Sequence, residues 1–239
     1  SVADNDFKVN AVNYYYPQAG DEHLPMAQPL LVDTKLEQAT LLDAPKVMQT
    51  YYGGAIWGEW HGNEYYYHDR RRGNQSYFLR KVVAADKSVK TLIEETDPQF
   101  IDPWVQTFMP LEKSKRLIWS SQRTGFQHLY LYDAVSGDLI NPITQGDFTV
   151  RVIRGVDEVN NVLYFEASGR ESARDPYLRH LYRVNLDGSD LRLLTPEAFE
   201  HSTQVSPDFQ YFVDSYSDAE TPTESWLRST ETSEKLLKL

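Results

Sequence analysis

The segment FQHLYLYDAVSGDLINPITQGD, residues 126–147, decides the fold class because nearly the same phrase returns later in the chain. In this segment an alternating run, HLYLYD, is joined to a second apolar run, DLINPIT, by the turn AVSG. Residues 179–197 read RHLYRVNLDGSDLRLLTPE and repeat that order, and the equivalent glycines, Gly137 and Gly188, are 51 residues apart (188 − 137). Repeats with periods of roughly 20–50 residues are typical of proteins built from stacked structural units.

The rest of the chain has the same pattern. Short runs rich in aromatic and β-branched residues alternate with turns that contain Gly, Asn or Asp, and no stretch has the period of an amphipathic helix. The runs fall into rounds of about four strands, which is the pattern of a β-propeller blade. We therefore predict an all-β chain that forms a partial β-propeller of about four and a half four-stranded antiparallel blades. It is expected to be one domain over residues 1–239, with blades at 14–45, 47–97, 102–147, 149–197 and 200–239.

The first of these blades is expected to be incomplete. Gln28–Asp33 and Ala39–Leu42 are predicted to be its last two strands. The first strands of the next two rounds are predicted at Thr50–Trp57 and Trp104–Phe108. A partial propeller leaves an unpaired strand edge at each end, so we expect an arc that does not close on itself, or an assembly in which these edges meet across a symmetry axis.

Composition excludes several classes of function. The 239 residues carry a net charge of −11, which is the wrong sign for binding a nucleic-acid backbone. There is no cysteine, so disulfides and thiolate metal sites are excluded. No apolar run reaches the ~18 residues that a membrane span needs. The chain begins SVADNDFK, without a signal peptide; we expect that a leader has been removed from an exported, periplasmic protein, although a cytoplasmic location stays open.

Several segments together resemble a known family. The Ser-Pro-Asp turn at 206–208 leads into an aromatic alternating strand, YYYPQAG (14–20) precedes PLLVD (29–33), and FMPLEKSKRLIWSSQRTGFQHLYLYD spans 108–133. In order and spacing these resemble the second part of the propeller of a bacterial dipeptidyl peptidase IV, of the prolyl oligopeptidase class of serine peptidases. SWLRSTETSEKLLKL (225–239) resembles the last strand before that family's α/β-hydrolase domain. The alternative is a free-standing, ligand-binding propeller of the TolB type.

The resemblance implies a parent enzyme that releases N-terminal Xaa-Pro and Xaa-Ala dipeptides. Its Ser-Asp-His triad would lie in the hydrolase domain, which we expect to be absent from this sequence. The chain has no G-x-S-x-G nucleophile elbow, and its nearest string, GEWHG (58–62), has Trp60 where the nucleophile would stand. We therefore predict no catalytic residue here, no cofactor and no activity in the chain alone.

Candidate site residues are few. The resemblance makes Phe108 and Met109 candidates for the wall of the substrate cleft; alternatively, Phe108 packs between blades. The adjacent pair Glu94-Glu95 could bind an ammonium group, but its place in TLIEETDPQ favours a solvated strand end. His128 and His180 occupy equivalent places in two blades and are expected to be structural. The turn NLDGSD (185–190) lacks the ligand pattern of a calcium loop, and we predict no metal.

The predicted partners rest on the same reasoning. They are peptide substrates of the parent enzyme, its own hydrolase domain and, through residues 7–20, a second copy of the chain. Tyr14, Tyr15 and Tyr16 are the candidate dimerisation residues, because the resemblance places the family's dimerising extension there. No nucleic-acid partner and no membrane span are expected.

Overall fold

A computed structural model, which describes residues 17–49, 56 and 58–239, contains only strands and turns in those residues. Most of the chain forms four antiparallel sheets, each made of four consecutive strands paired in chain order. The first sheet consists of β5 (Gly58–His61), β6 (Glu64–Arg70), β7 (Ser76–Val83) and β8 (Ser88–Thr96), and the second of β9 (Phe108–Leu111), β10 (Arg116–Ser121), β11 (His128–Asp133) and β12 (Leu139–Pro142). The third consists of β13 (Thr149–Asp157), β14 (Val162–Ser168), β15 (Arg179–Asn185) and β16 (Arg192–Leu193), and the fourth of β17 (Glu200–Val205), β18 (Tyr211–Ser217), β19 (Glu224–Ser229) and β20 (Lys235–Lys238).

The residues before the first sheet form two small two-stranded sheets. The hairpin of β2 (Leu30–Asp33) and β3 (Gln38–Leu41) corresponds to the two strands expected of an incomplete blade. The short strands β1 (Met26–Ala27) and β4 (Val47–Met48), which the sequence pattern did not predict, pair with each other on either side of this hairpin. Strands of two residues are too short to show a period.

The first strands of the first and second sheets were the least well predicted. Trp104–Phe108 is not a strand: β9 begins at Phe108, and Asp102 Oδ1 accepts the backbone N–H of Trp104 in a turn at 2.9 Å. The predicted strand Thr50–Trp57 lies almost wholly outside the described residues, and the first strand that the structure places in this sheet is β5, at Gly58–His61. The strand that the sequence pattern predicts at Val89–Glu94 is β8, which continues to Thr96 and therefore includes Glu95.

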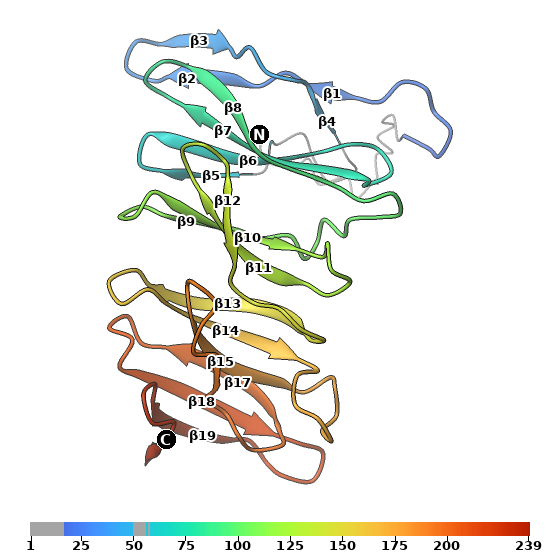
Figure 1. The fold of residues 1–239 in the computed structure, drawn as a ribbon. Coiled ribbons are helices and arrows are strands. Elements are labelled where there is room, and N and C mark those ends of the chain that lie inside the picture. Colours follow the sequence, from blue (N-terminus) through green and yellow to red (C-terminus); the bar gives the residue numbers. More distant parts are fainter. Residues whose placement is uncertain (1–16, 50–55, 57) are drawn as a thin grey trace, which may run out of the picture.

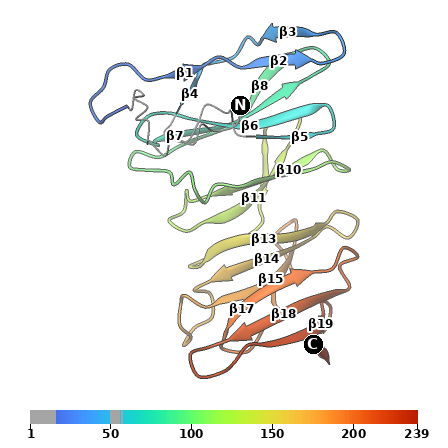
Figure 2. The same cartoon turned by 180° about the vertical axis from the view of Figure 1, so that it is seen from behind.

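The sheets stack face on face, and the stack is open. They succeed one another from the β2–β3 hairpin at the top of Figure 1 to the fourth sheet at the bottom, and the reverse view in Figure 2 shows the same order. A separate hydrophobic cluster fills each junction between neighbouring sheets, with Leu79 and Trp119 between the first and second, Leu131 and Phe165 between the second and third, and Leu181 and Phe212 between the third and fourth. Each sheet therefore buries its apolar faces only by contact with its neighbours, which explains why the phrase repeats.

The repeated glycine turns are contact points between sheets. Gly137 and Gly188 both have positive φ, at 81° and 86°. A Cβ on Gly137 would lie 2.4 Å from the carbonyl oxygen of Leu92 in the first sheet, and a Cβ on Gly188 would lie 3.1 Å from that of Pro142 in the second. Each of these positions requires glycine for two reasons: the turn conformation and the close approach to the preceding sheet.

Lysine side chains of the first sheet hold the same turn of the second. Lys90 Nζ donates to the carbonyl oxygens of Val135 and Ser136, at 2.6 and 3.0 Å. The buried Lys81 Nζ donates to the carbonyl oxygen of Ala134 at 2.8 Å and pairs with Glu64 at 2.9 Å. The turn AVSG is thus fixed to its neighbour by both packing and hydrogen bonds.

Candidate functional site

Phe108 lies at the junction of the first and second sheets. It is half-buried, and its ring centroid lies 5.0 Å from that of His68 and 5.9 Å from that of Tyr66, both on β6. Burial lowers the pKa of His68 to about 4, so its imidazole is neutral near pH 7. Phe108 therefore has the interblade packing that was the alternative to a place in the cleft wall, while part of its surface stays open to solvent.

The Met109 side chain faces the opposite side of β9 from that of Phe108. Successive residues on a strand face opposite sides of the sheet, and Met109 packs against the cluster between the second and third sheets. The structure therefore does not bring the two cleft candidates together on one face of β9.

The expectation of a solvated strand end is wrong for Glu95. Glu94 is exposed, but Glu95 is 7% exposed and accepts hydrogen bonds from Trp119 Nε1 at 2.8 Å and Ser121 Oγ at 2.6 Å. Arg123 lies 3.3 Å from the same carboxylate. Because donors of this protein already surround Glu95, the pair Glu94-Glu95 does not form an ammonium site.

Arg123 is itself held on several sides. It donates to Tyr132 Oη at 2.8 Å and lies over the ring of Tyr130, 4.3 Å from its centroid. Burial raises the pKa of Tyr132, so the phenol is neutral. Glu95 thus joins β8 of the first sheet to β10 and β11 of the second through a charged and aromatic cluster.

His128 and His180 play the same structural part in two sheets. His128 Nδ1 contacts Thr144 Oγ1 at 3.1 Å, and His180 Nδ1 contacts the carbonyl oxygen of Thr195 at 2.9 Å. His128 Nε2 also contacts the carbonyl oxygen of Gly146 at 2.9 Å. Burial lowers the pKa of both imidazoles, and His201 lowers that of His180 further. Each neutral histidine ties its strand to the segment that ends the repeated phrase.

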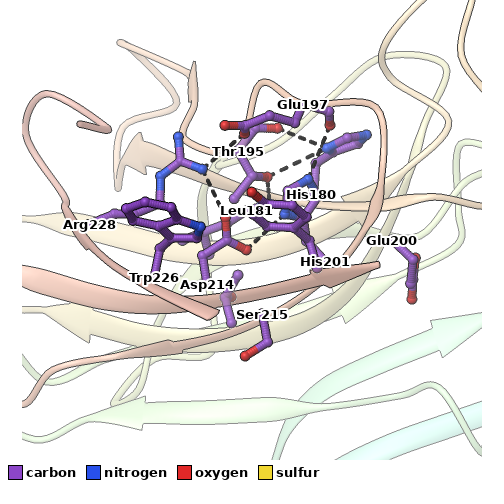
Figure 3. A network of polar contacts seen from close by, with 12 residues as sticks. His180, Leu181, Thr195, Glu197, Glu200, His201, Asp214, Ser215, Trp226 and Arg228 are labelled. Carbon is purple, nitrogen blue, oxygen red and sulfur yellow. Dashed lines mark hydrogen bonds and ion pairs between the residues drawn. The ribbon is translucent and has the colours of Figure 1, made fainter. Parts of the chain in front are cut away.

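A larger polar network, which the sequence analysis missed, lies between the third and fourth sheets (Figure 3). His201 Nδ1 lies 2.8 Å from Asp214 Oδ1, and Arg228 bonds the other Asp214 oxygen at 2.8 Å. Arg228 also bonds Glu197 at 2.9 Å, and Lys235 bonds Glu197 at 3.0 Å. Burial favours the neutral form of Glu197, but the bonds from Arg228 and Lys235 outweigh it and lower the pKa of Glu197 to about 2.

The pair of His201 and Asp214 has the separation seen in catalytic triads, but its surroundings differ. Both side chains are completely buried, and His201 Nε2 faces the backbone carbonyl oxygen of Glu197 at 3.1 Å instead of a serine hydroxyl. No substrate can reach this imidazole in the folded chain. The network is a structural one that joins the β16–β17 connection to β18 and β19.

A second buried carboxylate crosses the same junction. Glu166 on β14 is fully buried and accepts bonds from the backbone N–H and the Oγ1 of Thr203 on β17, at 2.9 and 2.8 Å, while Arg154 pairs with it at 2.9 Å.

Among the residues that the structure describes, no group of three or more His, Asp or Glu side chains could hold a metal ion. Those residues also contain no helix that could span a membrane.

Comparison with protein-family models identifies the family of the chain. The family model described as the dipeptidyl peptidase IV (DPP IV) N-terminal region matches residues 2–223. The chain belongs to this family. The match covers most of the sequence, including the repeated phrase and all of the first three sheets.

Curated relatives of this DPP IV N-terminal region are dipeptidyl peptidases. A probable dipeptidyl peptidase 4 from Aspergillus flavus is 26% identical over 154 residues, which are 60% of this chain and 19% of that protein. Dipeptidyl peptidase 8 from Homo sapiens is 30% identical over 138 residues, 46% of this chain and 15% of that protein. The matched region is therefore less than a fifth of the length of these relatives.

Solved structures show the same fold. Dipeptidyl peptidase 4 from Porphyromonas gingivalis superposes with a TM-score of 0.75 at 20% identity, over 95% of this chain and 31% of that one. A putative dipeptidyl aminopeptidase IV from Bacteroides ovatus gives a TM-score of 0.69, also at 20% identity, over 90% of this chain and 34% of that one. The chain thus corresponds in fold to about a third of each.

One set of predicted site residues remains, the candidates for dimerisation. Tyr14, Tyr15 and Tyr16 fall outside the described residues, so the structure does not place the predicted dimerisation segment. Glu95 was assigned wrongly and Glu166 was missed because the donors to both lie in a neighbouring sheet, and the His201 network was missed because its members come from separate strands of the fourth sheet and the connection before it. A local signal exists for Glu95: the alternation of Trp119, Ser121 and Arg123 puts its three donors on one face of β10 and the turn after it.

Proposed function

We propose that this chain is part of the propeller of a serine-type dipeptidyl peptidase that releases N-terminal Xaa-Pro and Xaa-Ala dipeptides. The family match over residues 2–223 carries the proposal. The chain walls part of the substrate cleft, and the triad is supplied by an α/β-hydrolase domain elsewhere in a longer polypeptide. The complete burial of the pair His201 and Asp214 supports a non-catalytic role.

A fluorophosphonate probe tests the serine-type assignment, because it labels activated serine nucleophiles covalently. The longer polypeptide is expected to lose dipeptidyl peptidase activity on labelling, and peptide mapping should find the label outside residues 1–239. Label on a serine within these residues, or activity that survives complete labelling, would contradict the proposal.

Within this function, Phe108 is proposed to shape the cleft wall, and Met109, which packs on the opposite face of β9, is proposed to support the strand that carries it. Phe108 is half-buried at the start of β9, where its ring can still offer an apolar surface. In the longer polypeptide, F108A is expected to raise KM for a Gly-Pro amide more than it lowers kcat, and M109A is measured beside it. A drop in thermal stability with unchanged KM would assign Phe108 to packing alone.

We also propose that the longer polypeptide is an exported homodimer that associates through residues 7–20. Replacing Tyr14, Tyr15 and Tyr16 together by Ala is expected to turn the dimer into a monomer in light scattering at micromolar concentration. Cell fractionation tests export: recovery of the protein with cytoplasmic markers would contradict that part of the proposal.

A further inference from the structure

Strand β2 of the hairpin pairs with one neighbour only. It forms a two-stranded antiparallel sheet with β3, and no other strand in the described part of the chain pairs with it. The backbone groups of successive residues on such a strand point alternately to its two edges, so the edge of β2 away from β3 presents N–H and C=O groups without a strand partner. The register with β3 identifies the residues to which these groups belong.

The backbone groups of Leu30 and Val32 face this open edge. Leu42 donates its backbone N–H to the carbonyl oxygen of Pro29 at 3.0 Å, so the backbone of Pro29 faces β3. Pro29 has no N–H to return, and Gln28 Nε2 replaces it by donating to the carbonyl oxygen of Leu42 at 2.9 Å. Because the direction alternates along the strand, Leu30 and Val32 point their N–H and C=O groups away from β3.

A groove runs along the open edge of β2. Its volume is about 410 Å³, within the range of binding pockets. Residues 27–32 line it in succession, whereas β3, which the structure describes in full, contributes none of its residues. The opposite wall comes from the first sheet and consists of Trp60, Tyr65, Tyr67 and Val82. None of the described side chains that line the groove is charged, so a charged group would lose its hydration there without gaining a partner.

The open edge of β2 lacks the residues that protect other strand edges in this fold. The last strand of each four-stranded sheet carries a Lys, an Arg or a Pro: Lys90 on β8, Pro142 on β12, Arg192 on β16, and Lys235 and Lys238 on β20. Such residues discourage the addition of a further strand, by their charge or by a missing N–H. The positions of β2 that face its open edge are Leu30 and Val32, which have neither property.

From these observations we propose that the groove binds an extended, uncharged peptide segment, which pairs with the open edge of β2 as an added strand. The backbone groups of Leu30 and Val32 supply the hydrogen bonds, and alternate side chains of the peptide pack on Trp60 and Tyr65. Strand β2 has four residues and is about 13 Å long, so the paired segment has about four residues as well. The site rests on this geometry and not on the proposed peptidase function, because the candidate cleft residues do not line the groove.

Amide hydrogen exchange of the 239-residue chain, read by NMR, tests the proposal at single residues. The probe is the peptide acetyl-Thr-Val-Thr-Val-Thr-amide. In the free chain the amides of Leu30 and Val32 are expected to exchange faster than that of Leu31, whose N–H faces β3. With the probe at ten times its dissociation constant, exchange at Leu30 and Val32 should become about tenfold slower.

A lysine-containing peptide, acetyl-Thr-Lys-Thr-Lys-Thr-amide, is the control for charge. The net charge of −11 attracts this peptide without regard to site, but the uncharged groove does not accept its side chains. It is therefore expected to give less protection of Leu30 and Val32 than the valine peptide at the same concentration.

Two variants at one position separate the backbone of β2 from its side chains. V32P removes the N–H that faces the groove, whereas V32A keeps that N–H and removes a side chain that is 54% exposed. Proline is tolerated on an edge strand where its N–H would be unpaired, so both variants should have similar urea midpoints. Affinity for the valine peptide, measured by calorimetry, should be about fivefold lower in V32P than in V32A, the ratio that one net hydrogen bond gives.

Equal affinities of V32P and V32A would overturn the proposal, because binding would then not use the edge of β2. Absence of protection at Leu30 and Val32 with the valine peptide at millimolar concentration would overturn it as well. So would protection of both amides in the free chain together with a lower urea midpoint for V32P than for V32A, since a segment of the chain itself would then occupy the edge.

Discussion

Glu94 and Glu95 are neighbours in sequence with opposite environments, which allows a matched test. Glu95 holds Trp119 and Ser121 across the first junction, so E95A leaves buried donors without a partner. We expect E95A to lower the free energy of unfolding by about 3 kcal/mol and E94A by less than about 0.5 kcal/mol. Urea denaturation measures both, and equal losses would mean that Glu95 is not held as described.

Glu197 should make stability depend on acid pH. Its pKa is about 2 in the folded chain against an ordinary 4.5, so its contribution is complete above pH 4.5 and is lost as the pH falls towards 2. The difference in Tm between the unaltered chain and E197Q should therefore be largest near neutral pH and shrink below pH 4.5. A difference that stays constant from pH 6 to 2 would contradict this assignment.

The environment of Glu95 shows what a sequence can tell at the scale of a residue. Alternation on a strand predicts that Glu94 and Glu95 face opposite sides, but both sides of a blade can be covered, and the donor Trp119 is 24 residues away (119 − 95). The repeated histidines were predictable as structural because their partners, Thr144 and Thr195, repeat with them. The network around His201 occurs once and leaves no such trace.

At the scale of elements, the repeated turns should be the least tolerant positions of the fold. G137A adds a Cβ that meets the Leu92 carbonyl oxygen at 2.4 Å, in a residue with a φ of 81°. Gly125 has a φ of 92° and open space around its Cβ position, so G125A suffers only the backbone strain. We expect losses of about 3 kcal/mol or more for G137A and about 1 kcal/mol for G125A in urea denaturation.

Equal losses for the two glycine variants would show that backbone conformation alone fixes glycine at 137. A larger loss for G137A would establish the turn as a contact between the first and second sheets. Gly188 offers a second case, since its Cβ would approach Pro142 less closely, at 3.1 Å. G188A should therefore fall between the other two.

The strands differed in how well the sequence predicted them. The sequence pattern predicts strands at Arg116–Ser121, His128–Asp133, Val162–Ala167 and Arg179–Asn185, and β10, β11, β14 and β15 agree with them within one residue. Alternation and turn residues, which define such hairpins, are both local. The start of the second sheet was not: the apolar run at Trp104–Phe108 forms a turn, and β9 begins where that run ends. Trp104 is 67% exposed, so an aromatic residue there did not mark a buried strand.

At the scale of the whole molecule, the open stack is a consequence of the repeat itself. Each sheet needs a neighbour on both sides, and the hairpin β2–β3 and the fourth sheet each have a face without one in the part of the chain that the structure describes (Figure 1). Leu30 and Leu41 on the hairpin are 52% and 70% exposed, and Leu237 on β20 is 57% exposed. These exposed apolar residues at the two ends are consistent with a part of a propeller, and this chain covers about a third of each superposed structure.

The central claim is that the chain is a non-catalytic propeller part of a dipeptidyl peptidase. The most direct test is hydrolysis of Gly-Pro p-nitroanilide by the purified 239-residue chain, with the longer polypeptide assayed beside it at equal molar concentration. The account predicts release of p-nitroaniline by the longer polypeptide and none above the buffer rate by this chain. Hydrolysis by the 239 residues alone, or none by either protein, would contradict it.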